Sequence, residues 1–240
     1  WLTVMWGGWP FMKIRSPLLG GFAILVTTYA LAVLVFRTLF NYDFLKGAPV
    51  YVARLDPQGP FDAWTALVFI VTCMAAAFLI LHFDLWPFTA RPQLMRKPVL
   101  GLVWTLAAIV VSALVCYVGM GVVGMAPPTF LTTITVPFLF GSIVVLITLE
   151  GSLYGGLRQP LRGVVSAATA AVVGIGLARL YVAVSGALSG EVAWGAPSFE
   201  GEVWLASALL AVTFPFLAYY ADYFGMWPLK APADAKSVSS

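Results

Sequence analysis

The chain has 240 residues, of which 61% are hydrophobic and only 10% are charged, and its mean hydropathy is +0.95. A water-soluble domain carries about 25% charged residues. The chain therefore has too few polar side chains to cover a globular surface in water, and its composition indicates an integral membrane protein. The net charge of only +3, with no basic run interleaved with aromatic residues, argues against a nucleic-acid partner.

The first eleven residues are apolar and begin at Trp1 rather than at Met. Neither the basic segment nor the cleavage motif of a signal peptide precedes them. We expect residues 1–11 to be the end of a further helix whose earlier residues lie upstream.

Six longer apolar runs follow, and each is long enough to cross a bilayer as a helix, which takes about 20 residues. The structure predicted from them is all-α: a polytopic transmembrane helix bundle with six full helices plus the end of the N-terminal one, arranged as helical hairpins. Residues 1–228 would form a single membrane domain, and residues 229–240 a short polar cytoplasmic tail. The six runs are 17–40, 62–83, 98–121, 131–153, 163–188 and 203–226.

Basic residues between the runs predict the orientation of the chain. If the runs alternate in direction, nine Lys or Arg residues fall on one side and three on the other, while Arg179 lies within a run. Cytoplasmic loops carry an excess of Lys and Arg. We therefore expect a bacterial-type inner (cytoplasmic) membrane, with the C-terminus in the cytoplasm. The nine are Lys13, Arg15, Arg91, Arg96, Lys97, Arg158, Arg162, Lys230 and Lys236, and the three are Arg37, Lys46 and Arg54.

Two short patterns recur at the ends of the runs. Each outward-going helix is expected to begin with Pro-x-x-Gly, because proline is well tolerated in a first helical turn. A Trp-Pro pair three residues after an aromatic residue occurs in WGGWPF, FDLWPF and FGMWPL. Tryptophan favours the headgroup level and proline ends helices. We interpret Trp9, Trp86 and Trp227 as interface anchors at the cytoplasmic boundary, with a docking surface for a subunit or lipid as the alternative.

Ionisable residues in or near the apolar runs are the candidates for ligand binding or gating. Arg179 lies about four residues from the middle of its run, which is roughly 6 Å from the midplane. Asp84, Glu150 and Asp222 stand at the inner ends of three helices, and Glu150 lies deepest. These carboxylates could admit a cation or proton, or they could remain hydrated at the helix ends.

His82 is the only histidine of the chain, which excludes a bis-histidine haem. We interpret it as a histidine at the membrane interface; the alternative is a single axial ligand to a haem or chlorin shared with another subunit. No metal site and no dedicated cofactor are predicted, and we expect bound lipid. No motif joins a nucleophile to a base, so no catalytic residue is predicted in this chain alone.

Small residues recur at helical spacing in the fifth run, and such a face lets another helix approach closely. Two prolines within the runs, Pro137 and Pro215, are expected to kink their helices. The residues of the small face are Gly163, Ala167, Ala171, Gly174 and Ala178.

Two functions agree with these features. The first is a non-catalytic integral-membrane subunit that anchors or scaffolds a larger membrane complex, because the chain has short inner loops, few intramembrane charges and no motif of its own. The alternative is a small transporter or channel-like permease for a neutral or weakly charged solute, with Arg179 and Glu150 as polar gates. A weaker third hypothesis is a lipid- or quinone-binding protein. The expected partners are membrane lipids and other membrane subunits.

Overall fold

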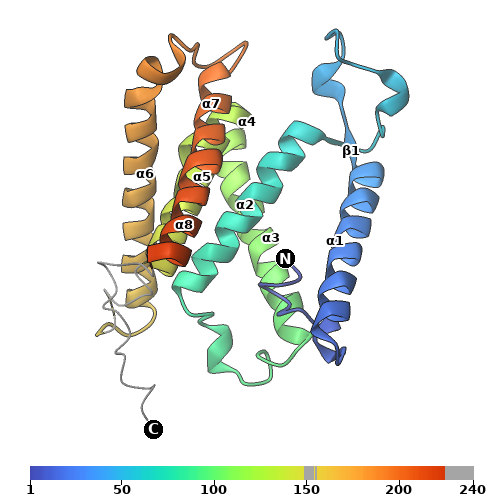
Figure 1. Ribbon diagram of the computed structural model, residues 1–240, viewed down its shortest axis with the longest axis vertical. Helices are drawn as coiled ribbons and strands as arrows, with labels where there is room; N and C mark the ends of the chain where they lie inside the picture. Colours follow the sequence, from blue (N-terminus) through green and yellow to red (C-terminus); the bar gives the residue numbers. More distant parts are fainter. Residues whose placement is uncertain (149–153, 155, 225–240) are drawn as a thin grey trace. The chain divides into compact units, whose positions relative to one another are not determined.

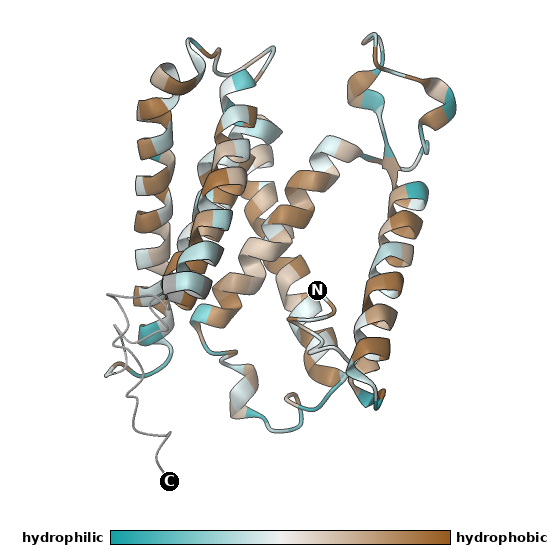
Figure 2. Ribbon diagram, viewed as in Figure 1, coloured by the Kyte–Doolittle hydropathy of each residue, from teal (hydrophilic) through white to brown (hydrophobic). Residues whose placement is uncertain are grey.

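The structure is a computed structural model, and it describes residues 1–148, 154 and 156–224. Six helical spans in this part of the chain are long and apolar enough to cross a membrane, and they coincide with the six predicted runs. In Figure 2 the ribbon is coloured by hydropathy, and hydrophobic residues recur along these helices. The prediction of an all-α, multi-pass membrane protein is confirmed.

The chain divides into two compact units. The first contains residues 1–77 and 85–127, and the second contains residues 78–84 and the described residues from 128 onward. The single domain over 1–228 stays a prediction, and the tail at 229–240 lies outside the described residues.

The first unit is built on three spans (Figure 1). They are α1 (Pro17–Leu39), α2 (Ala63–His82), whose last turn belongs to the second unit, and α3 (Val99–Cys116) with its π-helical extension η5 (Tyr117–Val122). Between α1 and α2, strands β1 (Phe40–Asn41) and β2 (Phe61–Asp62) form a short parallel pair. The remaining turns are 3-10 helices: η1 (Phe11–Lys13), η2 (Asp43–Leu45), η3 (Ala53–Leu55) and η4 (Phe88–Ala90).

The N-terminal segment differs from the prediction, because residues 1–10 form turns instead of the end of a helix. Gly7 and Gly8 have φ angles of +55° and +70°, a left-handed conformation that an α-helix cannot contain. The segment lies on α3: the indole of Trp6 packs where Gly101 has no side chain, and its Nε1–H donates to Thr105 Oγ1 at 3.3 Å.

The Trp-Pro pair at residues 86 and 87 does not itself end α2. This helix ends at His82, and Asp84 and Leu85 follow with φ angles of +51° and +61°. Two left-handed residues therefore break the helix before Trp86 and Pro87 are reached. Trp86 is exposed, whereas Trp9 is half-buried and stacks on Trp6 at a centroid distance of 5.9 Å. Trp227 lies outside the described residues, and the anchoring role of all three stays a prediction.

The second unit contains the other three spans. The first of these runs through α4 (Pro127–Phe130), η6 (Leu131–Thr135), α5 (Val136–Ile143) and η7 (Val144–Thr148). The long helix α6 (Leu161–Ser189) follows, and α7 (Glu200–Ala208), η9 (Leu209–Thr213) and α8 (Phe214–Phe224) form the last span. The Pro-x-x-Gly starts are confirmed, because Pro17 opens α1 while Pro98 and Pro160 directly precede α3 and α6.

The two prolines expected to kink their helices share one local arrangement. Each stands two residues after a π-helical segment: Pro137 follows η6, and Pro215 follows η9. Proline has no N–H to donate to the carbonyl four residues earlier, so α-helical bonding cannot continue through it. A π-helical turn, which bonds five residues apart, is one way in which a helix accommodates that loss.

α5 and α6 are packed with their backbones in contact. A Cβ atom on Gly174 would overlap the carbonyl oxygen of Pro137, and one on Gly141 would overlap the carbonyl oxygen of Ala170. Four of the five residues of the predicted small face are buried, and the fifth, Ala171, is half-buried. Only glycine at these two crossing points allows the helices to approach this closely.

We predict that Gly174→Ala destabilises the protein, because the added methyl group must push α5 away from α6. Overpacking of this kind costs about 1–3 kcal/mol. The matched control is Gly176→Ala, two residues along the same helix, where a Cβ meets no atom within 4 Å. Thermal unfolding in mild detergent should show a lower midpoint for Gly174→Ala only, and equal midpoints for the two variants would contradict the packing described here.

Candidate functional site

A pocket of about 520 Å³ lies within the second unit. Its walls come from the α4–η6–α5 span, from α6, from the loop before α7 and from α7 itself. Aliphatic side chains form much of the lining, and the polar groups are three threonines, Arg179 and Glu202. The lining residues are Thr129, Thr132, Thr133, Ile134, Pro137, Ile175, Ala178, Arg179, Val182, Trp194, Glu202 and Leu205.

Arg179 is the cation of this pocket. It stands on α6 four residues after the middle of the helix, which corresponds to roughly 6 Å along the axis. Its side chain is exposed to the pocket and makes no hydrogen bond or ion pair with residues 1–148, 154 or 156–224. The guanidinium is thus available to a bound molecule.

Glu202 is the anion of the pocket, and only 5% of its surface is exposed. It lies in the first turn of α7, where the positive end of the helix dipole favours a carboxylate. The carboxylate accepts a hydrogen bond from Thr129 Oγ1 at 3.2 Å, and both of its oxygens accept from the Gly195 N–H at 3.1 and 3.2 Å. These bonds connect α7 to α4 and to the preceding loop.

Trp194 covers one side of the pocket. Gly201 has no side chain, and this allows the Trp194 ring to lie directly against the backbone of α7. Gly195, the next residue, has a φ of +80° that suits glycine and presents its N–H to Glu202. The segment AWGAP therefore places an aromatic ring against α7 and a backbone N–H donor beside the buried carboxylate.

The threonines of the pocket belong to α4 and to the π-helical segment η6. Thr132 Oγ1 donates to the Pro128 carbonyl at 2.9 Å, which leaves the hydroxyl oxygen able to accept a hydrogen bond. π-helical turns inside α-helices occur frequently at functional sites. The hydroxyls give the pocket neutral hydrogen-bonding groups in addition to its two charges.

His82 forms a second polar centre in the same unit, and it is 2% exposed. Its Nδ1 lies 2.7 Å from Ser166 Oγ on α6, and its Nε2 lies 3.0 Å from Ser142 Oγ on α5. The ring is enclosed between helices, and the expected position of this residue at the membrane interface stays a prediction. The axial-ligand role stays a prediction, and it would require one of these hydrogen bonds to be broken.

Asp84 belongs to neither centre. It forms an ion pair with Arg162 at 3.3 Å and accepts a hydrogen bond from Gln159 Nε2 at 2.9 Å, both at the start of α6. Arg162 and Arg179 are 17 residues apart on one helix, which is about 25 Å. The structure therefore does not bring Asp84 and Arg179 into one site.

Two other predicted candidates cannot be placed. Glu150 lies outside the described residues, and Asp222 lies on α8 but its side chain is outside the description. Within the residues that the structure describes, no three His, Cys, Asp or Glu side chains are grouped so that they could hold a metal ion.

Several residues of the two centres were not singled out by the sequence. Glu202 reads as one of several acidic residues of a loop, and the burial of its carboxylate depends on contacts with Thr129 and Gly195. The threonines of the pocket could have been found from the segment PPTFLTTIT, where four threonines follow a proline pair at the start of an apolar run. Ser142 and Ser166 carry no comparable signal, because single serines are common on packed membrane helices.

We predict that His82→Ala destabilises the second unit, because two buried hydroxyls lose their ring partners. A buried group left unpaired costs about 1–3 kcal/mol. Thermal unfolding of His82→Ala, Ser166→Ala and the double variant should give a double-variant loss smaller than the sum of the single losses. Thr38→Ala on exposed α1, where the hydroxyl bonds to the Leu34 carbonyl at 2.8 Å, is the control and should change little. Strict additivity would mean that the His82–Ser166 contact contributes nothing.

The comparisons with known proteins give no further guide to the pocket. No protein-family model, curated protein or solved structure matches the chain. The feature that bears on function is therefore the polar pocket among the helices of the second unit.

Proposed function

We propose that the chain is a small membrane permease for a small solute that carries an acidic group and is neutral or weakly charged overall. The observation that carries this proposal is an arginine within a membrane span that faces a pocket and has no partner among the described residues. The pocket volume of about 520 Å³ lies within the usual range of about 300–1,000 Å³ for small-molecule sites.

The charge of Arg179 needs compensation at this depth. A charged side chain near the bilayer centre costs several kcal/mol unless it pairs, reaches the interface or faces a water-filled cavity. Arg179 faces a cavity, and a planar guanidinium binds a carboxylate or phosphate through two parallel hydrogen bonds. A solute with an acidic group would therefore replace water there with a stronger partner.

Glu202 and the threonines further limit the chemical class of solute that the pocket would bind. A carboxylate in the same pocket would repel a dianion and would favour a solute that also carries a positive group. A zwitterion of amino-acid type places opposite charges a few ångströms apart and is neutral overall. It would match a pocket that holds one cation, one anion and several hydroxyls.

The test is uptake into liposomes that contain the purified chain, with labelled alanine as the zwitterionic probe and labelled lactate as the anionic probe. Arg179→Ala should lower alanine uptake roughly 10- to 100-fold, because a hydrogen bond to a charged group contributes about 1.5–3 kcal/mol. Glu202→Gln should reduce alanine uptake more than lactate uptake. Arg15→Ala, an arginine just before α1, is the matched control and should leave both rates unchanged.

Wild-type liposomes that take up neither probe faster than empty liposomes would contradict a permease for such solutes. Equal uptake by the wild type and Arg179→Ala would remove Arg179 from the mechanism. Because Glu202 also supports the loop, each variant must first show a wild-type unfolding midpoint before its uptake is compared.

A second candidate is a non-catalytic subunit of a larger membrane complex, and the exposure of α1 favours it. Only 6% of the apolar window of α1 is buried against the rest of the chain. Such a helix contacts either lipid or another membrane subunit. In either role, the charge bias of the loops supports a bacterial-type inner membrane with a cytoplasmic C-terminus.

Particle mass in mild detergent distinguishes the two candidates. A complex subunit should co-purify with other membrane chains in fixed stoichiometry, and the mass should exceed that of a homo-oligomer with its detergent. A particle that contains this chain alone and transports alanine would exclude the subunit role.

A further inference from the structure

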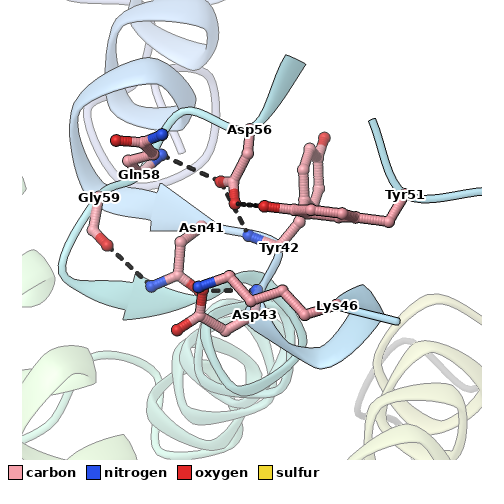
Figure 3. Close-up of polar contacts among 8 residues, drawn as sticks. All are labelled: Asn41, Tyr42, Asp43, Lys46, Tyr51, Asp56, Gln58 and Gly59. Carbon is pink, nitrogen blue, oxygen red and sulfur yellow. Dashed lines mark hydrogen bonds and ion pairs between the residues drawn. The ribbon is translucent and has the colours of Figure 1, made fainter. Parts of the chain in front are cut away.

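The loop between α1 and α2 is folded around one carboxylate (Figure 3). Asp56 Oδ1 accepts from the backbone N–H groups of Gln58 at 3.0 Å and Tyr42 at 3.1 Å, and its Oδ2 accepts from the Tyr51 hydroxyl at 2.9 Å. These bonds, with that from Gln58 foremost, lower the pKa of Asp56 below its ordinary value. Because the lowered pKa lies below 3.8, Asp56 is ionised at neutral pH and the loop keeps these bonds.

Asp43, Lys46 and Asn41, at the same end of α1, are also paired. Lys46 forms an ion pair with Asp43 at 2.6 Å. Asn41 Nδ2 donates to the Gly59 carbonyl at 2.8 Å, and its Oδ1 accepts from the Asp43 N–H at 3.1 Å. The cation of Lys46 is therefore matched within the loop.

Two arginines are left unmatched beside the same carboxylate. A pocket of about 470 Å³ is lined by Phe36, Arg37, Arg54, Leu55, Asp56 and Pro57. Neither Arg37 nor Arg54 forms an ion pair or hydrogen bond with the residues that the structure describes. Since Asp56 already accepts three hydrogen bonds, the pocket offers two guanidinium groups against one engaged carboxylate.

The position of the pocket indicates what would bind there. Arg37 lies in the last turn of α1, and the helix dipole accounts for a cation at that point. It does not account for Arg54, which lies in η3 and lines the same pocket. Val33 and Val26, one and three turns earlier on the Arg37 side of α1, are exposed and apolar.

We propose that this pocket binds the phosphate of an anionic lipid headgroup, with the acyl chains of that lipid lying along the exposed face of α1. Each guanidinium can donate paired hydrogen bonds to phosphate oxygens, and two of them together bind a phosphate from opposite sides. A headgroup at the membrane interface with apolar surface directly beside it is the arrangement of a lipid site. Free inorganic phosphate would use the same two arginines and would gain nothing from α1.

The test uses the full chain in nanodiscs that contain an equal mixture of phosphatidylglycerol and phosphatidylcholine, followed by native mass spectrometry of the lipids that stay bound. The wild type should retain phosphatidylglycerol in preference. The double variant Arg37→Ala/Arg54→Ala should lower that preference by up to roughly 30-fold, as two arginine–lipid contacts would. Lys46→Ala, a cation of the same loop that is already paired, is the matched control and should retain the wild-type preference.

A charge-preserving variant separates binding from folding. Arg37→Lys/Arg54→Lys keeps both charges but loses the paired hydrogen bonds, so it should retain more of the preference than the double alanine variant and less than the wild type, whereas a misfolded loop would lose it entirely. Addition of inorganic phosphate should not displace the bound lipid. Equal retention of phosphatidylglycerol by the wild type and the double alanine variant would overturn the proposal. So would displacement of the lipid by phosphate alone, which would identify the pocket as a site for the free anion.

Discussion

Where α5 crosses α6, two glycines allow the backbones to touch: Gly174 receives the carbonyl of Pro137, and Gly141 receives that of Ala170. In a membrane no hydrophobic effect drives helices together, so close packing and hydrogen bonds must supply the association. The polar centres depend on this crossing. It sets the separation of Ser142 from Ser166, between which the imidazole of His82 lies, and it fixes the wall from which Arg179 faces the threonines of η6.

The charges of the chain form two groups with different physical roles. Asp84 with Arg162, Asp43 with Lys46 and Asp56 with its three donors are engaged at the ends of helices or in loops. The two ion pairs are exposed and add little stability, because water solvates each partner well when it is alone, whereas Asp56 is a buried residue. Arg179, Arg37 and Arg54 face pockets but form no ion pair with the residues that the structure describes, because the carboxylate of each pocket, Glu202 or Asp56, is already hydrogen-bonded elsewhere. We propose ligands for these three arginines. What distinguishes the two groups is the presence of a partner, and not the type of residue.

Hydropathy is a sum over about 20 residues, so it predicts spans well, and all six were placed correctly. The start of α6 after Pro160 was also readable, because proline has a local, chemical reason to stand there. Hydropathy fails for residues 1–10. Their apolar composition predicts a helix, but Gly7 and Gly8 adopt left-handed φ angles and the segment forms turns.

The sites were less predictable than the spans. Arg179 could be identified from the sequence alone, because it is a charged residue within an apolar run. The burial of Glu202 and His82 depends on partners 73 and 84 residues away, which no local pattern in one sequence encodes. Asp56 was equally hidden, because its donors Tyr42 and Tyr51 become neighbours only when the loop folds back on itself.

The π-helical turns have a consequence for how the spans are compared with any other sequence. A π-helical turn contains one more residue than an α-helical turn. Because each residue of an α-helix corresponds to about 100° of rotation, the residues after the turn are rotated by about that angle from where a regular α-helix would place them. η6 lies between Thr129 and Ser142 in the sequence, so the rotation that it introduces separates these two residues. A helical-wheel diagram drawn through the whole span as a regular α-helix therefore assigns one of them to the wrong face. A protein with the same pocket but a regular α-helix here would be one residue shorter, so an alignment without a gap at 131–135 would match lipid-facing positions to pocket-facing ones.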